Sequence, residues 1–557
     1  MEEDAVNITK KIEEREKDFD PLWRTMDEDY LIWQVKESSY DRAIDAKTKR
    51  HGSDIDVIAN NLRLFSDDVG SILSDADRQI SVRMAEAEGK DKREDIGKLE
   101  RMFDFAFAKA DERLTNIILP PLLSDSIWRA SQRGCIAGRF LIYKGEGGTV
   151  IFDFLSYDPR WLVYQVGSNG LRWTNHTTFQ RPEELEDDYS KITKAKPWYK
   201  VWEKSKEVYK LRDYWKNDGK GKMTNSIICE NEFLVRETYD IPSMPVLIVP
   251  VATRPPIVDS TGKSEMPSHG ESIYAPLRTA NGMRNRFLSM AASHANRMAR
   301  QALINYKTAQ GVSIPSTTNV PDAVVELAMG ENRLEASPMK EISPSVLGLL
   351  NEFSGQVDGG VLPKVGLGNP PASGTAIDLV QESGNRVLNP QIRCLETFYA
   401  GACRLIEEQL LVGGITKDKI SKVKAQGVKK SKYYEVSVKP VDLKKPHIIQ
   451  VEFTARTPWT QMSIIQLADM LIQQGLPKGW VWENILKLQD PKLINDLLAL
   501  EIYEHSPEGM MKRSIEVLMD RGYEIEALRL RDQLIQIERM SNQEEANARP
   551  NEPPPVQ

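Results

Sequence analysis

Residues that carry catalysis are sparse in this chain of 557 residues, and they do not gather into a known motif. A nucleotide-binding phosphate loop needs spaced glycines before a lysine and a hydroxyl residue, because its backbone amides must surround the phosphates. The nearest glycine and lysine cluster, at 219–222, lacks the first spaced glycine and is typical of a turn. The dinucleotide, serine-hydrolase and zinc-protease motifs (GxGxxG, GxSxG and HExxH) are also absent. The sequence therefore predicts a protein that is not an enzyme and binds no cofactor.

Isolated reactive side chains leave two alternatives open. One of the six histidines, His294, shares a helical face with alanine and methionine residues, which favours a packed core histidine over a catalytic base. The neighbouring carboxylates Asp187 and Asp188 favour a solvated loop over a metal site, because acidic runs are usually exposed. The cysteines form no CxxC pair and have no histidine at ligand spacing, so we expect no metal site and four reduced, buried thiols: Cys135, Cys229, Cys394 and Cys403.

Composition narrows the class of protein further. The chain is too long for one compact core, so we expect three or four structural regions. No run of about 18 apolar residues is present, and the charged N-terminus has no apolar secretory core, so neither a membrane span nor a signal is expected. The net charge of -7 argues against tight binding to nucleic-acid phosphates. It is compatible with a passage through which DNA slides, because such a surface must not bind strongly.

The first half of the chain is expected to be helical and then rich in strands. Apolar residues at helical spacing predict helices over 1–45, 50–70 and 98–119. Another helix should end at Gly134, a suitable C-cap residue. β-branched and aromatic residues between Gly, Asn and Asp turns predict strands within 138–252, with the run 226–235 as one of them. A linker rich in Pro, Gly and Ser at 253–270 ends this part.

The second half is expected to be mainly helical, which makes the fold class α+β and predominantly helical. The expected helices are 271–305, 321–330, 344–360, 375–412 and several pieces between 459 and 540. The first of them would be about 50 Å long at roughly 1.5 Å per residue. Pro390 should kink the fourth. Strands are expected at 433–440 and 447–455, and the proline-rich end, 542–557, is expected to be disordered.

The helix at 271–305 is locally basic although the chain is acidic. Glu271 is its one acid, against five arginines, which are Arg278, Arg284, Arg286, Arg297 and Arg300. Two interpretations stay open for these arginines. They form either a solvated helix face or a surface that meets another subunit or DNA.

The order of these parts resembles that of tailed-bacteriophage portal proteins, the head-to-tail connectors of virions. The sequence SGTA at 373–376 is similar to the SG-x-A that opens a long helix in this family. The stretch that begins VEFTARTPWTQ at 451, followed by Asp490 and Pro491, is similar to the family's succession of strand, proline, helix, glycine, helix and Asp-Pro. A lysine follows here where the family commonly has an acid, and the segment before 344 is short and rich in proline.

The resemblance implies a portal-like subunit with wing, stem, clip and crown regions. Its regions would be an N-terminal helical and β-rich wing at 1–270, a first stem helix at 271–305, a clip at 306–343, a second stem helix at 344–360, a tunnel loop at 361–374, a long wing helix with β-strands at 375–456, a helical crown at 457–541 and a disordered tail at 542–557.

The resemblance also implies a function and partners. Such a subunit forms a homododecameric ring at one capsid vertex and conducts double-stranded DNA during packaging and ejection. It docks the terminase motor and later the tail adaptor, contacts capsid and scaffolding proteins, and resides in the host cytoplasm during assembly and then in the virion. The tunnel loop would face the DNA through Lys364, Val365, Leu367 and Asn369. For Lys364, an exposed lysine on an ordinary surface loop is the alternative interpretation.

Two other functions remain as alternatives. The chain can be a helical scaffold or adaptor of another assembly, but Gly282, Gly384 and Pro390 interrupt the heptads that long coiled coils need. It can also be an enzyme that acts on nucleic acid without a familiar motif. That function would require clustered carboxylates with a metal ion, and an activity assay with Mg²⁺ would reveal it.

Overall fold

The computed structural model divides the chain into two compact units, Met1–Arg456 and Thr457–Gln557. Helices hold 54% and strands 26% of the described residues, so the fold mixes α-helices with β-sheets, as predicted. The structure describes residues 4–36, 55–84, 90–145, 148–168, 170–182, 184–185, 189, 208–219, 221–251, 270–299, 303–307, 324–328, 333–336, 342–361, 374–415, 419–429, 432–440, 442–444, 447–454, 458–484, 506–520, 523 and 525–536.

The first unit opens with the helices α1 (Ala5–Trp33), α2 (Asn61–Ser74), α3 (Lys90–Asn116) and α4 (Leu122–Arg133). Gly134 ends α4 in the left-handed conformation, with φ of 67°, which confirms the predicted C-cap. A side chain at this position would also collide with the backbone of Gly270 and Glu271. Glycine is therefore required twice here, by its φ angle and by the segment that passes against it.

Two antiparallel sheets follow. In the smaller sheet, β2 (Cys135–Lys144) lies between β3 (Val150–Tyr157) and β9 (Val246–Pro250). The larger sheet is a meander of β4 (Leu162–Gly167), β5 (Gly170–Gln180), β6 (Tyr209–Asn217), β7 (Met223–Cys229) and β8 (Glu232–Tyr239). The strand β5 was not predicted, because the polar residues at its centre, Thr174 to Thr177, are buried within the fold and hide the usual alternation.

The prediction of a single strand over 226–235 is wrong. This segment forms a hairpin, in which Glu230 and Asn231 join β7 to β8. Both residues have positive φ angles, 46° and 70°. Two such residues make the tight turn whose twist suits paired strands. The turn escaped prediction because glutamate is not a turn residue and apolar residues stand close on both sides, at 227–229 and 233–235.

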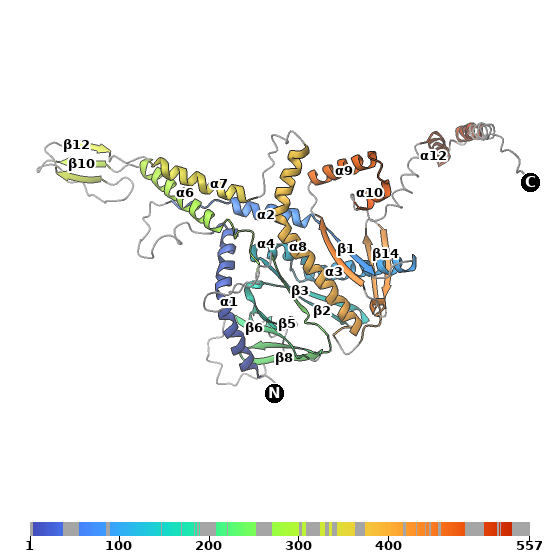
Figure 1. Ribbon diagram of the computed structural model, residues 1–557, viewed down its shortest axis with the longest axis horizontal. Coiled ribbons are helices and arrows are strands. Elements are labelled where there is room, and N and C mark those ends of the chain that lie inside the picture. Colours follow the sequence, from blue (N-terminus) through green and yellow to red (C-terminus); the bar gives the residue numbers. More distant parts are fainter. Residues whose placement is uncertain are drawn as a thin grey trace, which may run out of the picture. The chain divides into compact units, whose positions relative to one another are not determined.

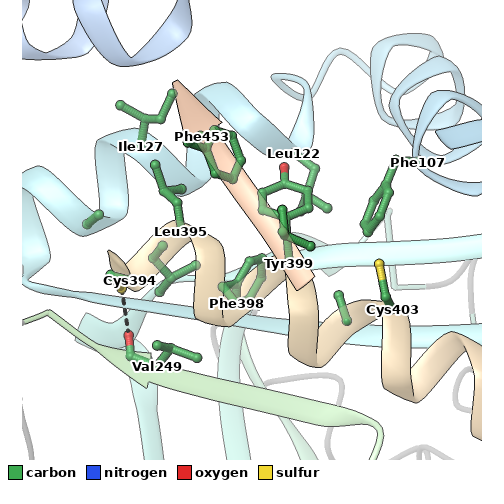
Figure 2. Packing of buried hydrophobic residues seen from close by; sticks show 14 of the residues in the cluster. Phe107, Leu122, Ile127, Val249, Cys394, Leu395, Phe398, Tyr399, Cys403 and Phe453 are labelled. Carbon is green, nitrogen blue, oxygen red and sulfur yellow. Dashed lines mark hydrogen bonds between the residues drawn. The ribbon is translucent and has the colours of Figure 1, made fainter. Parts of the chain in front are cut away.

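Helix α8 (Gly374–Val412) confirms the predicted long helix and forms the centre of the main core. Figure 2 shows Leu395, Phe398 and Tyr399 on this helix among buried residues of other elements. The ring of Tyr399 lies 4.9 Å from that of Phe107 and 5.5 Å from that of Phe453, measured between centroids. The core therefore joins a helix near the N-terminus to a strand beyond residue 440.

Two further sheets use strands from late in the chain. β1 (Asp77–Met84) pairs with β15 (His447–Thr454) along its whole length, although more than 350 residues separate them. β13 (Val423–Lys429) and β14 (Lys432–Val438) form a two-stranded antiparallel ribbon. β14 and β15 confirm the two predicted strands, whereas β13 was not predicted.

Between the β-rich part and α8 the chain forms a helical hairpin of α6 (Arg278–Ala299) and α7 (Pro344–Gly360), visible in Figure 1. The connection carries a three-stranded sheet of β10 (Leu303–Lys307), β11 (Val324–Ala328) and β12 (Arg333–Ala336), with β10 in the middle. α7 confirms the helix predicted over 344–360. The small helix predicted over 321–330 is wrong, because Val324 and Val325 pair in parallel with β10.

The predicted first helix of this hairpin, 271–305, is too long at both ends. Turns occupy 273–277, and the strand β10 begins at Leu303. The 22 residues of α6 span about 33 Å at roughly 1.5 Å per residue, and not 50 Å.

The regular structure described in the second unit is all helical, as predicted. It contains α9 (Pro458–Gln473), α10 (Lys478–Asn484), α12 (Pro507–Asp520) and a further helix at 525–536. The predicted tail at 542–557 lies outside the described residues. No described helix combines the length and the apolar character that a membrane crossing needs.

Candidate functional site

Helices α6 and α7 run antiparallel and pack along their length. The rings of Phe287 and Phe353 stack with centroids 5.8 Å apart and planes 16° from parallel. Nearer the start of α6, Arg284 Nη1 lies 4.0 Å from Asp358 Oδ1. Higher numbers on α6 thus meet lower numbers on α7. The connection with β10, β11 and β12 therefore joins the ends of both helices that lie farthest from Arg278.

A buried carboxylate on α1 binds the start of α6 through hydrogen bonds. Asp29, which is 2% exposed, accepts hydrogen bonds from Nε and Nη2 of Arg278, both at 2.8 Å. The Ser272 hydroxyl donates to the same carboxylate at 2.6 Å. Burial lowers the pKa of the Arg278 guanidinium, but its hydrogen bonds and attraction to Asp29 carry that pKa above its ordinary value. Such a two-bond pair fixes direction as well as distance, so it orients the hairpin on the N-terminal helix.

The middle of α6 holds the segment 55–59 through three side chains, which are Asn285, Ser289 and Ser293. They accept hydrogen bonds at 2.8–3.1 Å from the backbone amides of Ile55, Val57 and Ala59. The two serine hydroxyls also donate to backbone carbonyls of the segment. The two spacings match because two extended residues advance about 6.6 Å and four helical residues about 6 Å. The hairpin is thereby tied to the N-terminal part at a second place.

The arginines predicted on this helix fall into three groups. Arg278 and Arg284 direct their guanidinium groups to partners within the chain, Asp29 and Asp358. Arg286 is half-buried on α6. The Arg297 side chain and all of Arg300 lie outside the described residues. A contact of these arginines with another subunit or with DNA stays a prediction.

The four residues predicted to face DNA, Lys364, Val365, Leu367 and Asn369, all lie outside the described residues. The structure brings together other residues that the sequence analysis missed. Among them are Asn285, Ser289 and Ser293, whose hydrogen bonds to the backbone of 55–59 form a ladder. Their spacing of four on a helix was a visible signal, but nothing in it identified an extended backbone as the partner. A second missed feature is the lysine-rich ribbon of β13 and β14.

A buried polar network joins the two large antiparallel sheets. Arg139 on β2 lies between Asp153 on β3 and Asp213 on β6, with N–O distances of 3.0 and 3.3 Å. The Tyr157 hydroxyl donates to Asp213 at 2.5 Å, and the Asn225 amide donates to its other oxygen at 2.6 Å. Each buried charge thus has an opposite charge or a donor beside it, which is the condition for a stable buried network. The network holds the two sheets together.

His176 extends this network and is neutral at neutral pH. Its ring stacks on Tyr157, with centroids 4.1 Å apart, and its Nε2 accepts the Asp158 backbone amide at 3.3 Å. Burial lowers the pKa of His176 to about 4, although Asp213 and Asp158 raise it in part. The unfolded chain therefore takes up a proton near pH 6.5 that the folded chain takes up only near pH 4.

We expect the first unit to lose about 3 kcal/mol of unfolding free energy through His176 as the pH falls from 6.5 to 4. Below pH 4 this contribution should not change further. The measurement is urea unfolding of the wild type and of His176→Gln at several pH values. Over this interval the unfolding free energy of the wild type should fall relative to that of His176→Gln. A difference that is independent of pH would contradict the expectation.

In the part of the chain that the structure describes, the remaining candidates for chemistry do not assemble into a site. All four cysteines are buried free thiols, as predicted. Among the residues that the structure describes, no group of three or more His, Cys, Asp or Glu side chains is placed to hold a metal ion. Asp187 and Asp188 lie outside those residues.

No model of a known protein family matches the chain, and no curated protein matches its sequence. Its function must therefore be inferred from the order and the geometry of its elements.

Proposed function

We propose that the chain is the subunit of a bacteriophage portal. Twelve copies would form a ring at one capsid vertex and conduct double-stranded DNA during packaging and ejection. The ring would have no catalytic activity of its own. It would dock the terminase motor first and the tail adaptor later, and would contact capsid and scaffolding proteins during assembly in the host cytoplasm.

The observation that carries this proposal is the antiparallel hairpin of α6 and α7 with its small terminal sheet. It stands in the chain between a β-rich part and the long helix α8, which is the order of parts in portal subunits. In the proposal, α6 and α7 are the stem, β10 to β12 are the clip, and the first unit up to β9 is the wing. α8 is the long wing helix and the second unit is the crown.

The contacts of the hairpin fix its position on the N-terminal part, as a stem requires. Asp29 fixes its start on α1, and the ladder on Asn285, Ser289 and Ser293 fixes it again farther along. Stacked Phe287 and Phe353 hold the two helices together. The segment 361–374 that follows α7 contains the proposed DNA-facing residues, Lys364 among them.

The test is electron microscopy of the purified full-length chain, with its mass measured in solution. We expect rings with a central hole and a mass near twelve times 63.2 kDa. A monomer or an elongated dimer that forms no rings, even with capsid and scaffolding proteins present, would overturn the proposal. That result would favour a helical scaffold or adaptor of another assembly.

A further inference from the structure

The ribbon of β13 and β14 lies in an unusually basic segment of an acidic chain. Residues 417–445 contain ten lysines, three acids and no arginine, whereas the whole chain has a net charge of -7. The rest of the chain is therefore more acidic still. Such a local reversal attracts anionic partners to one place while the remaining surface repels them.

The ribbon turns four apolar residues inward and three lysines outward. Its inner face joins the main core beside α3 through Val423, Val436 and Val438, and these residues and the neighbouring Ala425 are at most 6% exposed. The alternation of a strand then places the neighbouring residues on the opposite face. The exposed residues there include Lys422, Lys424, Lys439, Glu435 and Tyr433, the last of them 66% exposed.

The register brings like charges together on the ribbon. Val423 pairs with Val438, so Lys422 and Lys439, the next residue on each strand, flank the same end of the ladder. At the other end, Lys429 is paired with Lys432. Lysines opposite one another destabilise an antiparallel pair. Within the described part of the chain, Lys422, Lys424 and Lys439 form no ion pair, and Glu435 is the one acid on their face of the two strands, so the face keeps a net positive charge.

The chemistry of this face favours a phosphate backbone over an acidic protein. Interfaces between proteins are depleted in lysine and enriched in arginine and apolar anchors, and this segment has lysines without arginine. Lysine binds a phosphate as a point charge and requires no fixed geometry. A two-stranded ribbon is also narrow enough for the major groove of duplex DNA.

We propose that the outer face of the β13–β14 ribbon is a contact site for the phosphate backbone of double-stranded DNA, which it binds without reading sequence. The site is separate from the proposed tunnel loop and does not depend on the ring. Binding through such lysines is weak and dependent on salt, because each contact releases counterions from the DNA.

The test compares the full-length protein with the triple variant Lys422→Glu, Lys424→Glu and Lys439→Glu. The matched control reverses three exposed lysines of the N-terminal part, Lys10, Lys17 and Lys36, and changes the net charge equally. Relaxed closed circular DNA is the probe, because it cannot thread through a closed ring. Binding is measured at about 50 mM and about 200 mM salt, with the mass of each protein measured alongside.

We expect the triple variant to bind the circular DNA at least about tenfold more weakly. The slope of the logarithm of its binding constant against the logarithm of the salt concentration should become shallower by about 0.9 for each lost contact. The control should bind as the wild type does. Equal binding by the triple variant and the control would overturn the inference, and so would stronger binding to an acidic polypeptide than to DNA. Rings that form normally in a triple variant with unchanged DNA binding would leave the portal proposal intact. Loss of DNA binding in a protein that never forms rings would support the DNA site and not the portal.

Discussion

Replacing Asp29 with asparagine is expected to lower the unfolding free energy of the first unit by about 3–5 kcal/mol. The Asp29 side chain is 3% exposed and receives two hydrogen bonds from Arg278 and one from Ser272. Asparagine has nearly the same shape but no charge, so the Arg278 guanidinium would stay largely buried without its counter-ion. The loss is large because a buried charge whose partner is removed keeps its desolvation penalty.

Urea unfolding followed by tryptophan fluorescence measures this loss. The matched control is Asp18→Asn on the same helix, which breaks an exposed pair with Arg15 of equal length, 2.8 Å. The control should change stability by no more than about 1 kcal/mol, because water solvates exposed pairs. Similar losses in the two variants would show that the Asp29 pair does not hold α6 in place.

Replacing Phe398 with alanine is expected to destabilise the first unit by about 3–5 kcal/mol. Phe398 is completely buried on α8, and its ring lies 5.5 Å from that of Phe140, measured between centroids. It packs directly over Gly138 on β2, where a side chain would come within 3.1 Å of its ring. The substitution would leave a cavity between α8 and the sheet. Sheet and helix backbones cannot close such a gap without losing other contacts.

The matched control for this prediction is Phe179→Ala. Phe179 is 48% exposed near the end of β5 and contacts Trp161. Its loss should lower the unfolding free energy by about 1 kcal/mol or less. Thermal and urea unfolding of both variants measure the difference. A Phe398 variant as stable as the control would mean that α8 does not organise this core.

The sequence by itself determined the elements whose signals are local. Ser343 and Pro344 begin α7, and the Ser343 side chain accepts the Ser345 amide at 3.3 Å. Gly134 ends α4 because its φ angle suits glycine. The long helix α8 was predicted almost to the residue. Caps, breakers and a sustained apolar face act within a few residues, so they can be recognised in the sequence without knowledge of the fold.

Part of the candidate site could also be recognised in the sequence. The basic character of α6 was clear from its arginines, and the lysine run around β13 and β14 is plain in the sequence. Which of these charges face outward was not. Arg278 joins a carboxylate some 250 residues earlier, whereas Lys422 and Lys424 remain exposed because α3 and the main core cover the other face of their strand.

Only the tertiary structure decided the elements that depend on distant partners. Val324 and Val325 suit both a short helix and a strand, and pairing with β10 makes them a strand. β13 has lysine, glycine and glutamine among its seven residues, and it becomes a strand because β14 pairs with it. β1 pairs with β15, which lies near the end of the sequence of the first unit. The free energy of such pairs comes from contacts between segments far apart in the chain, which no local pattern of residues encodes.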